Sequence, residues 1–160
     1  MRGGALPPAL LCVALAFALA FAPQRVLWKA AGLMLLAAAL SALLPWPQKA
    51  IEAIFIACWG SVIVTAALVH LRRGLGDRAA LLLAANAGLW AGAIITVAGT
   101  RLDLVWALPC VLLAFPAAWL VRHRGGIAVK VVASWLIAVA ILAGTLPIVP
   151  TPGYVPDHME

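Results

Sequence analysis

Six long apolar stretches follow one another along this chain with almost nothing between them, and they constrain its fold more than any other feature. A helix needs about 20 apolar residues to cross a bilayer. We therefore expect membrane-spanning helices at about 5–22, 26–45, 51–71, 79–99, 103–121 and 126–147. Of the 160 residues, 66% are hydrophobic and 10% are charged, whereas soluble domains are about 45–50% apolar and about 25% charged. The prediction is an all-α integral membrane protein, a six-transmembrane-helix bundle forming one domain over 1–147.

The residues after the last stretch, 148–160, are rich in proline, including Pro150, Pro152 and Pro156. Proline cannot continue a helix and favours an extended path. We expect these residues to form a tail outside the bundle.

Basic residues are unevenly divided between the two sets of loops. The loops after the first, third and fifth spans and their flanks hold Arg25, Lys29, Arg72, Arg73, Arg78, Arg122, Arg124 and Lys130. The opposite side holds Arg2, Lys49 and Arg101. Since cytoplasmic loops carry the excess of Lys and Arg, we expect both termini, and therefore the tail, to be extracytoplasmic. The abundance of Ala, Gly and Arg fits a GC-rich bacterial genome, so we expect the bacterial inner (plasma) membrane.

The first stretch also has the features of a signal peptide, namely an early Arg2, an apolar run and an A-x-A end. Pro23 would follow the best cleavage site directly, which is unfavourable. An uncleaved first segment with its start inside would also reverse the charge distribution described above. We therefore expect a true span.

A stripe of small residues recurs at every fourth position of the fourth span, which places it on one helix face. Its members are Ala80, Ala84, Gly88, Gly92, Thr96 and Thr100. In lipid, helices associate largely through close packing of small residues. We expect Ala84, Gly88 and Gly92 to be helix-packing residues, the neighbouring helix to approach closely, and the fourth span to lie at the centre of the bundle.

A shift of 76 residues aligns the two halves of the chain. It places Arg25 on Arg101 and Trp59 on Trp135. Three spans in each half would make the halves a 3+3 inverted repeat, an architecture common among secondary transporters. Two alanine-rich sets of helices also align by chance, so the repeat stays one of two interpretations. Within the second half, Pro109 and Pro116 should kink the fifth span.

Few polar side chains lie mid-span, and these are the candidate ligand-binding residues. Asn86 and Trp90 are four residues apart and share a helix face, opposite to the small stripe. The other candidates are the mid-span residues Trp59, Ser61, Ser134 and Trp135. One interpretation is a small cavity for a weakly polar or aromatic ligand; the other is a hydrogen bond between helices that only determines which helices meet. No acidic residue lies mid-span.

Several classes of function are disfavoured. The net charge of +6 comes mainly from the loops, so we expect no nucleic-acid partner. No catalytic or nucleotide-binding motif occurs, the three cysteines form no CxxC pair, and no histidines have ligand spacing. We expect no enzyme, no metal and no cofactor.

Two classes of function remain. The first is membrane transport, as a small permease or as the membrane-embedded component of a larger transporter. The alternative is a non-catalytic subunit, assembly factor or scaffold of a membrane protein complex. Besides the lipid bilayer, the expected partners are further copies of the chain, as a homo-oligomer, or other membrane protein subunits.

Overall fold

The computed structural model describes residues 6–71, 74–98 and 108–146, and the regular elements in these ranges are all helical. The α-helices are α1 (Leu6–Leu19), α2 (Gln24–Leu43), α3 (Ile51–Leu68), α4 (Asp77–Ala98), α6 (Ala114–Leu120) and α7 (Gly126–Thr145). Shorter helical segments are η1 (Gln48–Ala50), η2 (Leu108–Leu113) and η3 (Val121–Gly125). The expected tail 148–160 and the first residues of the expected span 103–121 lie outside the described ranges.

Four segments are long and apolar enough to cross a membrane: Gln24–Leu43, Ile51–Leu68, Asp77–Val97, and the continuous stretch Pro109–Thr145 that contains α6 and α7. At 1.5 Å per residue, the 20 residues of α2 span about 30 Å, the thickness of a hydrocarbon core. The 14 residues of α1 reach only about 21 Å. The described residues confirm the all-helical architecture, and their four long apolar helices are consistent with a helical membrane protein, while the number of six spans stays a prediction.

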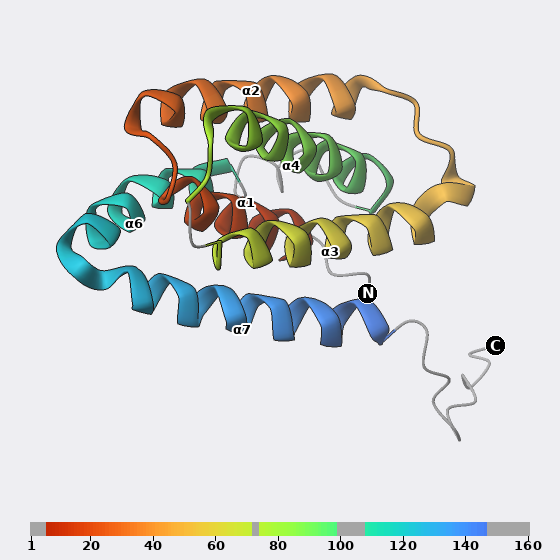
Figure 1. The fold of residues 1–160 in the computed structure, drawn as a ribbon. Coiled ribbons are helices and arrows are strands. Elements are labelled where there is room, and N and C mark those ends of the chain that lie inside the picture. Colours follow the sequence, from red (N-terminus) through yellow and green to blue (C-terminus); the bar gives the residue numbers. More distant parts are fainter. Residues whose placement is uncertain (1–5, 72–73, 99–107, 147–160) are drawn as a thin grey trace.

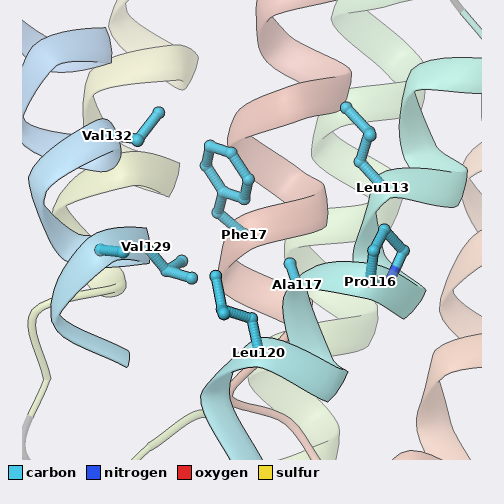
Figure 2. A pocket seen from close by; sticks show the side chains of 8 residues that line it. Phe17, Leu113, Pro116, Ala117, Leu120, Val129 and Val132 are labelled. Carbon is cyan, nitrogen blue, oxygen red and sulfur yellow. The ribbon is translucent and has the colours of Figure 1, made fainter. Parts of the chain in front are cut away.

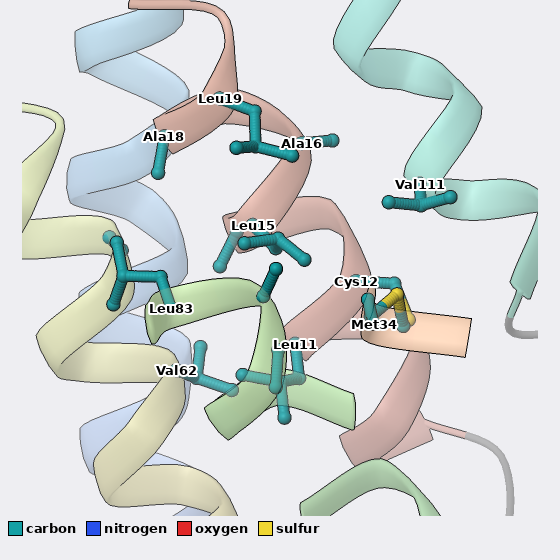
Figure 3. Close-up of a cluster of buried hydrophobic side chains, with 14 of the residues drawn as sticks. Leu11, Cys12, Leu15, Ala16, Ala18, Leu19, Met34, Val62, Leu83 and Val111 are labelled. Carbon is teal, nitrogen blue, oxygen red and sulfur yellow. The ribbon is translucent and has the colours of Figure 1, made fainter. Parts of the chain in front are cut away.

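The centre of the bundle is α1, not the fourth span as expected. α1 contacts α3, α4, η2, α6 and α7, and lies between them in Figure 1. Among its side chains only Leu6 is exposed, and Leu11, Leu15 and Leu19 are fully enclosed. Figure 3 shows them in one cluster with Val62 of α3 and Leu83 of α4, and shows Met34 of α2 beside Cys12 of α1. The small stripe did not reveal this, because it packs α4 onto a single neighbour.

That neighbour is α2, and the two helices approach each other as closely as the stripe predicted. A Cβ at Gly88 would meet the carbonyl oxygen of Met34 and lie 2.8 Å from the Cβ of Ala37. A Cβ at Gly92 would meet the next turn of α2 in the same way. Ala84 is fully buried. The hydroxyl of Ser41 donates to the carbonyl of Leu89, 2.7 Å away, so a hydrogen bond also joins the helices.

The fifth expected span is broken in its described part. It begins as the 3-10 segment η2, which includes Pro109, and continues as the seven-residue α6, with Pro116 in its first turn. Proline lacks the backbone N–H that a helix interior requires. After α6 the chain reverses through η3, where His123 leaves helical geometry and Arg124 adopts a left-handed φ of 67°. α6 and α7 therefore diverge from a hinge at 121–125 (Figure 1).

The described parts of the three basic loops meet at one end of the bundle, which we call the basic end. Arg25 pairs with Asp77 across 3.0 Å. The guanidinium of Arg122 donates to the side chain of Gln24, also at 3.0 Å. Phe21 lies between the loops: its carbonyl accepts from the Leu75 N–H, and the Lys130 ammonium lies 5.8 Å from its ring centroid. The chain thus gathers most of its described positive charge at one end.

Candidate functional site

Three of the predicted residues form one hydrogen-bonded chain between α3 and α4. The indole Nε1 of Trp90 donates to Oδ1 of Asn86 at 3.0 Å, one helical turn away. The Nδ2 of Asn86 in turn donates to the hydroxyl of Ser61 on α3. Asn86 lies nine residues into α4, about 14 Å along the axis, and Ser61 ten residues into α3. The chain of polar groups therefore lies near the middle of both helices, far from their ends.

The Asn86 amide retains hydrogen-bonding capacity. An asparagine side chain offers two N–H donors and two acceptor lone pairs. Among the described residues, the amide uses one donor toward Ser61 and accepts one bond from Trp90. One N–H and one lone pair remain, and the side chain is only half-buried. In lipid, where water does not supply a partner, such groups favour contact with another polar group.

These polar groups open into a groove on the outer surface of the bundle. The groove has a volume of about 370 Å³. It is lined by Ala57, Gly60, Ser61 and Val64 from α3 and by Leu82, Leu83, Asn86 and Trp90 from α4. Val64 and Leu82 form its exposed rim. The groove therefore faces the surroundings of the bundle, not its interior.

Gly60 forms part of the groove wall, and the sequence interpretation missed it. A Cβ added at Gly60 would meet nothing within 4 Å, whereas one at Gly88 or Gly92 would collide with α2. The small residues of α4 are thus used inside the bundle, while the small surface of α3 at Gly60 and Ala57 is left open. A signal was present in the sequence, since Ala57 and Ser61 are one helical turn apart and Gly60 adjoins them.

The other predicted residues do not join this site. Trp59 is 5% exposed, lies edge-on to Phe55, and its Cβ adjoins Gly144 of α7. Ser134 donates to the Lys130 carbonyl and lies 3.0 Å from Nε2 of His70. Trp135 is 60% exposed on α7. The described structure therefore does not bring all six candidate residues together in one cavity, because α7 packs on α3 through a different face, away from Asn86.

The chemistry available in the groove is uncharged hydrogen bonding. Its lining holds a hydroxyl, a carboxamide and an indole, and otherwise aliphatic side chains. Within the described ranges, no group of three or more His, Cys, Asp or Glu side chains is arranged to hold a metal ion. The arrangement can recognise a polar group carried by an otherwise apolar partner.

The helices and the surface on which the groove lies have the features of a helical membrane protein. Comparison of the chain with protein-family models, with curated proteins and with solved structures finds no match.

Proposed function

We propose that this chain is a non-catalytic, membrane-embedded subunit or scaffold that binds a transmembrane helix of a partner in the α3/α4 groove. The observation that carries the proposal is the combination of an unfilled small surface at Gly60 with the polar chain Ser61–Asn86–Trp90. Small residues that permit close approach and hydrogen bonds between helices are the two devices that join helices in lipid.

A self-sufficient permease is supported less well. A solute path needs a polar lining that continues through the membrane. The polar groups of the groove occupy one depth, and aliphatic Val64 and Leu82 form its rim. Transport remains compatible with the proposal in the other expected form, as the membrane-embedded component of a larger transporter.

The finer topology belongs to the same proposal. We infer six spans with the basic end in the cytoplasm of a bacterium, so that both termini lie outside. The clustering of Arg25, Arg122 and Lys130 at one end supports a common side for their loops. The 3+3 inverted repeat is supported by the sequence offset and by the packing of α3 on α7, the third members of the two halves.

Photocrosslinking in the native membrane tests the proposal. A photoreactive phenylalanine analogue is placed at Val64 on the groove rim or at Leu36 on α2, two positions that are each 56% exposed. Val64 should capture one defined membrane protein, and Leu36 should not. Identical products from both positions, or lipid adducts alone from Val64, would contradict a helix-binding groove. A product of twice the chain mass would identify the partner as a second copy.

Substitution of the groove residues provides a second readout. Gly60→Leu fills the open surface and Asn86→Leu removes the amide, so both should reduce recovery of the partner after gentle extraction. Gly32→Leu is the matched control, because Gly32 lies on α2 and also has open space around it. Equal recovery with all three variants would overturn the proposal.

A further inference from the structure

A second hollow, the hinge crevice, lies between the diverging helices α6 and α7. Its volume is about 270 Å³. Figure 2 shows Phe17 of α1 as its floor, with Leu113, Pro116 and Leu120 on one side and Val129 and Val132 on the other. All of its lining side chains are apolar. Its shape follows from the hinge at 121–125, which makes the two helices diverge.

One end of the hinge crevice adjoins the basic end. Leu120 and Val129 border the hinge that carries Arg122 and Arg124, and Lys130 directly follows Val129. Arg122 and Arg124 are exposed, and the ammonium of Lys130 lies over Phe21, one turn beyond the floor residue Phe17. A hydrocarbon slot and a group of cations are therefore joined end to end.

Aromatic residues mark this end of the crevice as the level of the lipid headgroups. Trp119 is exposed beside the ring of His123, with centroids 4.4 Å apart. Trp28 is exposed against Phe115, with centroids 4.6 Å apart. Tryptophans concentrate at the membrane–water interface. The cations thus lie where phosphate groups of the bilayer are available.

We propose that the hinge crevice binds an anionic phospholipid, with one acyl chain between α6 and α7 and the phosphate group at Arg122, Arg124 and Lys130. Charge complementarity and continuity from an apolar slot to a basic rim carry the assignment. A partner helix fits this crevice poorly, because its floor is the bulky Phe17 and its lining offers no hydrogen-bonding side chain. The α3/α4 groove, by contrast, has the small residue Gly60 in its wall and hydrogen-bonding side chains in its lining.

The test measures retained lipid by native mass spectrometry after exchange of the full-length protein into vesicles of phosphatidylcholine with phosphatidylglycerol. The wild-type chain should retain phosphatidylglycerol in preference to phosphatidylcholine. Lys130→Gln or Arg124→Gln should each lower this retention about fivefold, the effect of removing one cation near an anionic surface. Arg78→Gln is the matched control, since Arg78 lies at the basic end on α4, which contributes no lining residue.

Two neighbouring valines of α7 separate binding in the crevice from general surface attraction. Val132 lines the crevice and Val131 does not, although they are 40% and 63% exposed. Val132→Phe should reduce phosphatidylglycerol retention severalfold, and Val131→Phe should leave it unchanged. Ala128→Phe, at another exposed lining position, repeats the test if Val132→Phe does not fold. Unchanged retention in a folded crevice variant, or equal losses with Arg78→Gln and Lys130→Gln, would overturn the assignment.

Discussion

The carbonyl oxygen of Met34 on α2 occupies the space that a side chain at Gly88 of α4 would require. The same relationship recurs one turn further on between Ala38 and Gly92. These two contacts set the distance between helices over which Ser41 reaches the Leu89 carbonyl. The separation of α2 and α4 is therefore determined by backbone meeting backbone.

Gly88→Ala should destabilise the protein by about 1–3 kcal/mol, the usual effect of overpacking, because the added methyl collides with backbone that cannot move independently. Gly32→Ala is the control, as its methyl would meet nothing within 4 Å. It should be neutral or stabilising by up to about 1 kcal/mol through helix propensity. Reversible unfolding in mixed micelles, followed by circular dichroism, compares the two. Equal stability of the variants would contradict the close packing.

Removing the Asn86–Ser61 hydrogen bond should cost little stability. Such bonds between membrane helices contribute about 0.6 kcal/mol on average. A double-mutant cycle with Asn86→Leu and Ser61→Ala in the same unfolding assay should give a coupling energy near that value. A coupling above about 2 kcal/mol would show that the amide is mainly a structural group. In that case the binding role of the groove would lose its support.

Trp59 and Trp135 occupy equivalent positions in the aligned halves of the sequence, yet truncating them should change the stability of the protein by very different amounts. Trp59→Ala leaves a cavity between α3 and α7, which should destabilise by about 3–5 kcal/mol. Trp135→Ala removes an exposed ring and should change stability by less than about 0.5 kcal/mol. The assay is again unfolding in micelles. Comparable losses would indicate that Trp135 is buried by a partner or by a second copy.

Cysteine labelling tests whether the basic loops share one side of the membrane. Cys12 and Cys58 are fully buried, so only Cys110 needs to be replaced by serine to prevent labelling of the native cysteines. Gln24→Cys and His123→Cys should both react with an impermeant maleimide from the cytoplasmic side. Pro47→Cys, at the far end of α2, should react from the opposite side. Labelling of Gln24→Cys and His123→Cys from different sides would rule out the arrangement.

Much of the fold could be predicted from where apolar residues run on and where they stop. The expected spans 51–71, 79–99 and 126–147 correspond to α3 (Ile51–Leu68), α4 (Asp77–Ala98) and α7 (Gly126–Thr145). The thickness of the bilayer sets the length of a membrane-spanning helix, so such helices can be located from the length of the apolar runs in the sequence. Pro109 and Pro116 likewise predicted the helix irregularity that is found at η2 and α6.

How the helices pack against one another was harder to predict from the sequence. In a soluble protein the polar face of a helix shows which side points outward, but in lipid the outer face is as apolar as the inner one. The four-residue spacing of Asn86 and Trp90 predicted that they share one face of a helix. The hydrogen bond between them is consistent with that placement. Nothing in the sequence of α7 showed that Ser134 and Trp135 face away from that bond. The central position of α1 was hidden for the same reason.

The position of α1 has a consequence for the order of assembly. It precedes every other described helix along the chain, yet its neighbours in the bundle are α3, α4, η2, α6 and α7. When synthesis has passed α3, only one of these neighbours exists. Until the later segments arrive, the described part of α1, about 21 Å long, lacks most of the contacts that will enclose it. Among the described helices, α1 is therefore synthesised first but gains its last contacts only when α7 has been made.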